Sequence, residues 1–132
     1  MLTIRDSQIQ AFTRVRMPEL GRRLREWLQT THPSRIEGLT ESALGDQIMT
    51  CLEKAGAFGM RGDRDMFRWM ELCLRHGFDF TDRPENGWMV SILRDKRINS
   101  PADRLTYLMD LCRLREETAE SNRRLREAYL QR

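Results

Sequence analysis

The sequence predicts an all-α fold: a compact bundle of five or six helices with a central buried helix and a polar helical extension at its C-terminal end. Apolar residues recur at three- and four-residue steps through most of the 132 residues. No segment alternates apolar and polar residues for long, so no strand is expected. Hydrophobic residues make up 39% of the chain and charged residues 33%, which suits the core of one domain. We therefore divide the chain into a helical domain, residues 1–112, and a polar helical tail, residues 113–132.

The first predicted helix begins near Arg5 or Asp6 and carries apolar residues at helical spacing. These residues are Ile9, Phe12, Val15, Leu20, Leu24, Trp27 and Leu28. Pro18 interrupts the pattern, because proline lacks a backbone donor and clashes with the carbonyl four residues earlier. We expect either a kink near residues 14–17 or two helices, with Pro18 in the first turn of the second. Residues 30–38, TTHPSRIEG, form a connector because they contain proline and glycine.

A second helix is expected to begin at Thr40 or Ser42 and to end by Gly59. Its buried side is predicted to consist of Leu44, Ile48, Met49, Leu52 and Ala55. The following segment, AGAFGMRGD (residues 55–63), contains three glycines, but it follows no strand and lacks the Gly-Lys-Ser/Thr of a P-loop. It is typical of a helix end followed by a turn, not of a phosphate-binding loop.

The stretch from Gly62 to Leu93 concentrates the apolar mass of the chain and is expected to hold the central helix. Asp63 is predicted to be its N-cap, and Gly77 to end it after His76. Its apolar residues are Met66, Phe67, Trp69, Met70, Leu72, Cys73 and Leu74. Because they cover more than one stripe, we expect burial on more than one side. A short helix then buries Trp88, Met89, Ile92 and Leu93.

The last helix begins at Ser100 and Pro101, since serine is a preferred N-cap and proline a preferred first helical residue. Its inward residues are predicted to be Leu105, Leu108, Met109, Leu111 and Cys112. Beyond Arg113 the apolar spacing thins, and a helix without a buried face is marginal by itself, so the tail either frays or lies on a partner. We predict that its partner contacts are made by four apolar residues and three arginines: Leu114, Leu125, Tyr129, Leu130, Arg123, Arg124 and Arg126.

We expect the cysteines and histidines to have structural roles. Cys51, Cys73 and Cys112 are far apart and fall on the apolar sides of predicted helices, so we expect buried thiols instead of a metal site or a disulfide. His32 is isolated in the connector. His76 ends the central helix, where we expect it to cap free carbonyls as a cation stabilised by the helix dipole.

Pairs of carboxylates are the remaining catalytic candidates. Asp79 and Asp82 flank a turn, where aspartate commonly hydrogen-bonds its own backbone, and Glu116 and Glu117 lie among arginines as surface ion pairs. No serine or cysteine comes with a histidine and a carboxylate in a nucleophile setting. The sequence therefore predicts no catalytic residue, no metal, no cofactor and no enzyme.

The net charge of +3 is the small difference between 23 basic and 20 acidic residues, so no nucleic-acid partner is implied. A helix-turn-helix between Thr40 and His76 is conceivable. Its second helix is apolar all round, however, and acidic residues balance its arginines. No apolar run is long enough for a membrane span, and the N-terminal residues lack the apolar block of a signal peptide, so we expect a cytoplasmic protein without membrane contact.

The order of segments resembles that of a known group of proteins. An opening LTIRDSQIQAF precedes a tryptophan-containing helix ending in HP, then the segment GAFGMRGDRDMFRWMELCLRHGFDF and a tryptophan followed by ILRD. This order, over roughly residues 1–112, resembles small helical proteins encoded beside spike-tip, chaperone and effector genes of bacterial type VI secretion clusters. The resemblance implies a non-enzymatic effector chaperone, co-chaperone or loading adaptor, and it transfers no functional residue.

The expected partner is a protein: a secreted effector, its chaperone or a spike protein, with a homodimer also possible. Two alternatives stay open. The chain could be an immunity protein that neutralises a cognate toxin, or, in a different class, a helix-turn-helix DNA-binding regulator.

Overall fold

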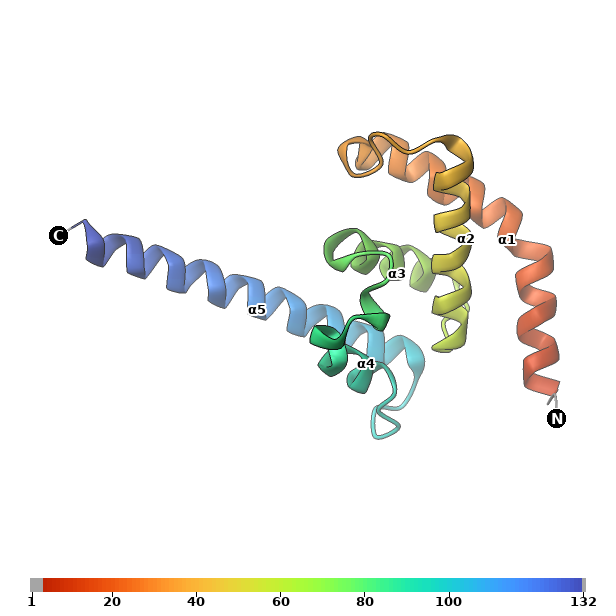
Figure 1. Ribbon diagram of the computed structural model, residues 1–132. Coiled ribbons are helices and arrows are strands. Elements are labelled where there is room, and N and C mark those ends of the chain that lie inside the picture. The colour runs from red at the N-terminus through yellow and green to blue at the C-terminus, as the bar shows by residue number, and fades with distance from the viewer. Residues whose placement is uncertain (1–3, 132) are drawn as a thin grey trace.

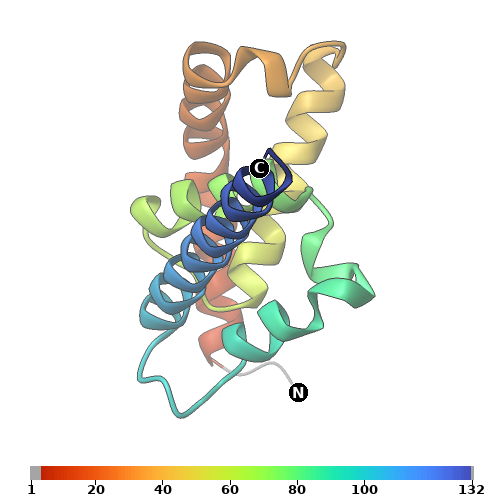
Figure 2. The same ribbon diagram turned by 90° about the vertical axis from the view of Figure 1, so that its left-hand side faces the viewer.

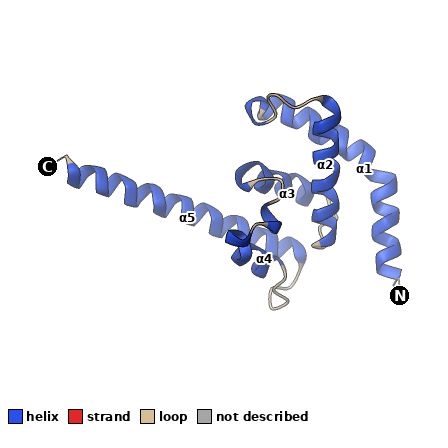
Figure 3. Cartoon of the chain, viewed as in Figure 1, coloured by secondary structure: helices blue, strands red, loops and turns tan. Residues whose placement is uncertain are grey.

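The computed structural model describes the backbone of residues 4–131 and the side chains of residues 18–131. It consists of five α-helices and three short 3-10 turns, with no strand among the described residues (Figures 1 and 3). The helices are α1 (Ile4–Thr31), α2 (Glu41–Ala57), α3 (Asp63–His76), α4 (Gly87–Leu93) and α5 (Pro101–Leu130). The turns are Pro33–Arg35, Phe80–Asp82 and Pro84–Asn86. The predicted all-α class is confirmed. No described helix combines the length and the apolar character needed to cross a bilayer.

Helix α1 is a single element with Pro18 inside it, so the first of the two expected arrangements is correct. Figure 1 shows α1 changing direction between its red and its orange part. Pro18 accounts for the bend, because it cannot donate a hydrogen bond to the preceding turn and its ring crowds that turn. Leu20, Leu24 and Leu28 are buried as predicted. The side chains of the earlier stripe residues, Ile9, Phe12 and Val15, lie outside the described part of the chain.

The core is one apolar cluster, and each of the five helices contributes residues to it. For α1, the side chains are described from Pro18 onward. Helix α2 packs on α1 and α3, and α5 packs on α3 and α4. Trp69 of α3 is 1% exposed, and its ring lies 5.3 Å from that of Phe58 and 5.2 Å from that of Phe80. No polar or charged residue is buried among the described residues. Helix α3 is therefore the predicted central helix, covered on more than one side.

The ends of the helices follow the sequence signals in most cases. The Thr40 hydroxyl accepts a hydrogen bond from the Ala43 backbone at 3.0 Å, which caps α2. The Ser100 hydroxyl accepts one from the Asp103 backbone at 3.1 Å, which caps α5. Gly77 ends α3 with φ +106°, a conformation that side-chain-bearing residues rarely adopt.

Three predictions about individual residues are wrong. Leu111 of α5, predicted to face inward, is partly exposed and does not belong to the apolar core. Gly62, not Asp63, is the N-cap of α3, and Asp63 is the first helical residue, where its carboxylate pairs with Arg23 of α1 at 2.7 Å. An acidic side chain at this position still favours the helix dipole, and here it also joins two helices. Met49 is 38% exposed. It lies one residue beyond Ile48, on the edge of the apolar stripe of α2, and so points partly away from the core.

Helix α5 continues without a break through the boundary between the predicted domain and the predicted tail. Figure 1 shows its C-terminal half extending beyond all the other helices, and Figure 2 views the molecule from that side. We call residues 113–130 the α5 arm.

Candidate functional site

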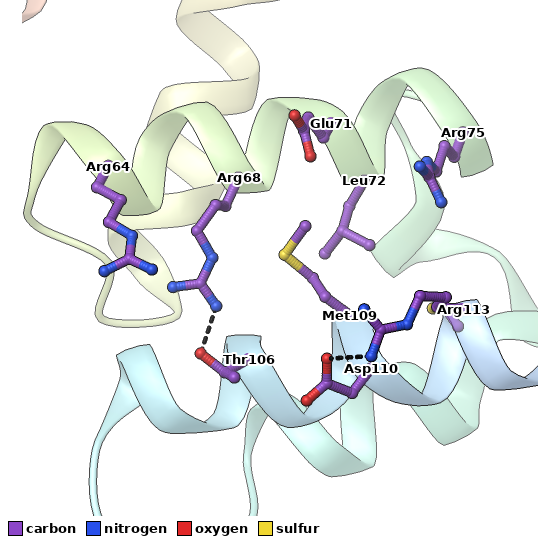
Figure 4. Close-up of a pocket in the computed structure, with 10 residues that line it drawn as sticks. Arg64, Arg68, Glu71, Leu72, Arg75, Thr106, Met109, Asp110 and Arg113 are labelled. Carbon is purple, nitrogen blue, oxygen red and sulfur yellow. Dashed lines mark hydrogen bonds and ion pairs between the residues drawn. The ribbon is translucent and has the colours of Figure 1, made fainter.

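A groove of about 290 Å³ lies between α3 and α5 (Figure 4). Helix α3 contributes Arg64, Arg68 and Arg75, whose spacing of four and seven residues places them on one side of the helix. Helix α5 contributes Arg113 to the opposite rim. The remaining lining residues are Glu71, Leu72, Thr106, Met109, Asp110 and Cys112. Four arginines against two carboxylates give the groove a positive character.

Much of this charge is already used within the chain. Arg68 pairs with Asp65 on its own helix at 3.3 Å and donates to the Thr106 hydroxyl on α5 (Figure 4). Arg64 makes no ion pair among the described residues, and its guanidinium lies at the rim of the groove. Arg68 therefore links α3 to α5 through its hydrogen bond to Thr106. Arg64 is the cation of the groove best placed to bind an external anion.

The other end of the groove shows the same pattern. Arg113 pairs with Asp110 at 3.3 Å, and Arg75 reaches from α3 to Glu116 on α5 at 3.3 Å. All four side chains are more than half exposed, so each pair contributes little to stability. The groove can bind a carboxylate or an apolar side chain. It presents no nucleophile beside a base, and we derive no reaction from it.

The histidines differ from expectation in one case. His76 does not act as a charged cap: its Nε2 is buried and has no hydrogen-bond partner. Burial lowers the pKa of His76, an effect that Arg75 reinforces and Glu116 opposes, so the ring is neutral at neutral pH. His32 packs edge-on against the ring of Trp27, with centroids 5.0 Å apart. Both histidines thus have packing environments and face no catalytic group.

All three cysteines are buried and free, as predicted. The thiols of Cys51 on α2 and Cys73 on α3 are in contact, and either can donate a hydrogen bond to the other. This contact with Cys51, together with burial, raises the pKa of the Cys73 thiol far above its usual value. Burial also raises the pKa of Cys112. Protonated, buried thiols are poor nucleophiles and poor metal ligands. The described residues contain no group of three or more histidine, cysteine or carboxylate side chains placed to hold a metal ion.

The carboxylates of the loop after α3 bind basic side chains, which corrects the expectation that they bond their own backbone. Asp79 accepts a hydrogen bond from Arg83 at 2.9 Å, and Asp82 pairs with Lys54 of α2. The loop is thereby fastened to α2, and neither carboxylate is available as half of an acid and base pair. Glu116 forms a surface ion pair, as predicted, but its partner is Arg75 of α3 and not an arginine of the tail. The prediction is wrong for Glu117, which forms no ion pair among the described residues.

The predicted partner-binding residues all lie on the α5 arm and are exposed. Leu114 is 53% exposed, Leu125 59%, Tyr129 72% and Leu130 80%. Arg123 and Arg124 both bind Glu120, at 2.6 Å and 3.1 Å. Near its start the arm contacts the rest of the molecule, where Arg115 lies 3.7 Å over the ring of Trp88 and Glu116 pairs with Arg75. Large apolar side chains on an unsupported helix mark the arm as the main candidate binding surface.

Helical geometry divides these predicted residues between faces, which the sequence list did not anticipate. At 3.6 residues per turn, Leu114, Leu125 and Tyr129 share one face of the arm. Arg123, Arg126 and Leu130 lie on the opposite face, which continues the core-facing side of α5, and Arg124 lies between the two. We call Arg123, Arg126 and Leu130 the arginine face. The role of all seven residues in binding stays a prediction.

Comparison with known proteins adds no relative to this description. No protein-family model, no curated protein and no solved structure matches the chain.

Proposed function

We propose that this protein is a non-enzymatic protein-binding accessory, an adaptor or chaperone, that engages its partner through the α5 arm. One observation carries the proposal: about half of a 30-residue helix extends from the core with its large apolar side chains exposed. Ordering backbone costs roughly 1–2 kcal/mol per residue, and an isolated helix of this length is marginal in water. A binding partner supplies the contacts that offset this cost.

The composition of the arm suits a protein partner. Aromatic and arginine side chains are favoured at protein interfaces, and the arginine face offers two guanidinium groups beside Leu130. Guanidinium groups bind carboxylates in planar, bidentate pairs, so the matching surface on the partner is acidic. From the order of segments in the sequence, which resembles that of accessory proteins of type VI secretion clusters, we propose a secreted effector, its chaperone or a spike protein as that partner.

The DNA-binding alternative receives less support. Its reading helix would be α3, which buries Met66, Trp69, Met70, Leu72 and Cys73 against its neighbours. The exposed side of α3 lines the groove, where Arg68 and Arg75 already bind acidic side chains. Non-specific DNA affinity needs several unopposed cations on one face. An immunity protein directed at a nuclease would favour an acidic surface, which the net charge of +3 does not provide.

The test is affinity capture from a lysate of the native host with four forms of the purified protein as bait. The first is the full chain, and the second lacks residues 115–132. The third carries Arg123→Glu with Arg126→Glu on the arginine face. The fourth is its charge-matched control, Arg22→Glu with Arg61→Glu, at exposed positions away from the arm.

We expect the full chain and the control to enrich a common acidic partner at least tenfold over the truncated and arginine-face variants, about 1.4 kcal/mol of binding free energy. The melting temperature of the truncated protein should stay close to that of the full chain. A truncated protein that unfolds would contradict the proposal, because the arm would then belong to the domain's own core. Equal capture by the truncated form would place the binding surface elsewhere.

A further inference from the structure

The side of α5 that faces away from the core carries an uncharged stripe along almost the whole helix. Its positions alternate spacings of four and three residues, which is the heptad pattern of a coiled-coil seam. We call this stripe the seam; it consists of Tyr107, Leu111, Leu114, Thr118, Ser121, Leu125 and Ala128. Half of the residues between Arg113 and Leu130 are charged, yet none of those charges falls on the seam.

The seam is open to a second molecule. Tyr107 is 50% exposed, and Leu114 and Leu125 are more than half exposed. Thr118 and Ser121 are exposed as well. The core residues of α5 lie on the other side of the helix, since helical spacing separates the two stripes by about half a turn. Among the described residues, none from the rest of the chain covers the arm's part of the seam.

We propose that the seam is the interface with a second copy of this chain, packed antiparallel. In that arrangement each layer joins residues whose numbers sum to 239. Leu114 packs against Leu125 of the second copy, Leu111 against Ala128, and Thr118 against Ser121, and each layer occurs twice by symmetry. Two leucine layers flank a small polar centre, so every exposed leucine of the seam acquires an apolar neighbour.

The charges beside the seam favour this direction. Glu117 and Arg124 flank the seam on the same side, and in the antiparallel register each faces the other across the interface. Among the described residues Glu117 has no ion pair within its own chain. Arg124 pairs with Glu120 of its own chain, and its exposed side chain can also reach Glu117 of the second copy. The dimer thereby forms two matched pairs of opposite charge.

A parallel dimer lacks this match. It would place Glu117 beside Asn122 and Arg124 beside Tyr129, neither of opposite charge. Its one favourable pairing would join Asp110 to Arg115 and would draw Arg115 away from the ring of Trp88, whereas the antiparallel pairing uses Glu117, which has no ion pair to lose among the described residues.

A shallow groove of about 710 Å³ lies at the N-terminal end of the seam, between α4 and α5. Tyr107 and Leu111 of the seam line it together with Ile92 of α4. The antiparallel register places the end of the second copy's arm, at Ala128, against Leu111. The groove therefore receives the tip of the opposite arm and extends the interface from the seam onto the body of the domain.

This inference goes beyond the proposed adaptor function, because it concerns the opposite face of the arm. In the dimer the arginine face remains exposed on both copies, so the assembly offers two equivalent sites for the acidic partner. Loss of dimerisation and loss of partner capture are separate measurements, and either can fail while the other succeeds.

The first experiment measures the mass of the purified full-length protein by sedimentation equilibrium over a wide range of concentration. We expect a monomer–dimer equilibrium. Leu114→Lys with Leu125→Lys should raise the dissociation constant at least tenfold, about 1.4 kcal/mol, because lysine keeps helix propensity but charges both leucine layers. Leu130→Lys introduces the same chemistry on the arginine face and should leave the dissociation constant unchanged. A wild-type protein that is monomeric at every concentration would overturn the proposal.

The second experiment tests the register by exchanging the two flanking charges. Glu117→Arg and Arg124→Glu should each weaken the dimer, since each places like charges across the interface. The double variant, which exchanges both charges, should restore the dimer toward wild-type affinity. A parallel dimer brings these residues to different neighbours and predicts no restoration, so a double variant as weak as the single variants would refute the antiparallel seam.

Discussion

Replacing Trp69 by alanine tests the assignment of α3 as the centre of the core. The indole ring is 1% exposed and packs against the rings of Phe58 and Phe80. Removing a buried tryptophan costs about 3–5 kcal/mol, which includes the cavity that the ring leaves behind. A domain of this size is stable by about 5–15 kcal/mol, so the variant loses about a fifth of its stability or more. At about 3–5 °C per kcal/mol for a chain of this length, the melting temperature should fall by about 10–25 °C.

Thermal unfolding followed by far-ultraviolet circular dichroism measures this loss. The matched control is Trp88→Ala, which removes the same side chain from a partly exposed site under Arg115. The control should cost clearly less, because part of the Trp88 ring is already in contact with water. A Trp69→Ala protein that melts within a few degrees of the wild type would show that the ring is not at the centre of the core.

The remaining predictions concern a histidine, a glycine and the thiols. The free energy of unfolding should fall as the pH drops below about 6.5, because the folded state lowers the pKa of His76 and the unfolded state therefore binds its proton first. Urea titrations at several pH values should show that the free energy of unfolding depends less on pH in His76→Gln than in the wild type. Gly59→Ala should destabilise the fold by more than about 1 kcal/mol, since Gly59 has φ +91° and a Cβ there would lie 2.8 Å from Pro101. In the same urea assay the control Gly56→Ala, at a position of α2 with open space around it, should be neutral or stabilising. The three native thiols should resist iodoacetamide until the protein is denatured, and mass spectrometry showing rapid alkylation of the folded protein would contradict their burial.

Local signals in the sequence predict most of the elements correctly. Thr40, Ser100 and Gly77 act where the sequence placed them, because a cap or a left-handed glycine depends on groups within a few residues. The apolar stripes of α3 and α5 are likewise properties of one helix each. The kink at Pro18 was one of two expected outcomes, and the choice between them depends on whether the helical backbone continues past the proline.

The binding surface was only partly predictable. The sequence indicates a tail with few anchors, but the two faces of the arm become distinct only when residues 113–130 are known to form one helix with α5. The seam is inconspicuous in the sequence because threonine, serine and alanine interrupt its leucines. The seam becomes recognisable only on the exposed helix, where it forms one stripe without a charged residue.

The sequence by itself determined the all-α class, the positions of the helices and the burial of the cysteines, since helical periodicity and capping are local properties that side-chain spacing records. Only the tertiary structure decided which neighbour each polar group meets. It paired Asp63 with Arg23, enclosed the Nε2 atom of the half-buried His76 without a hydrogen-bond partner, and brought the sulfur atoms of Cys51 and Cys73 into contact. These contacts join residues that are distant in the chain, and their geometry follows from how the helices pack, which no local pattern specifies.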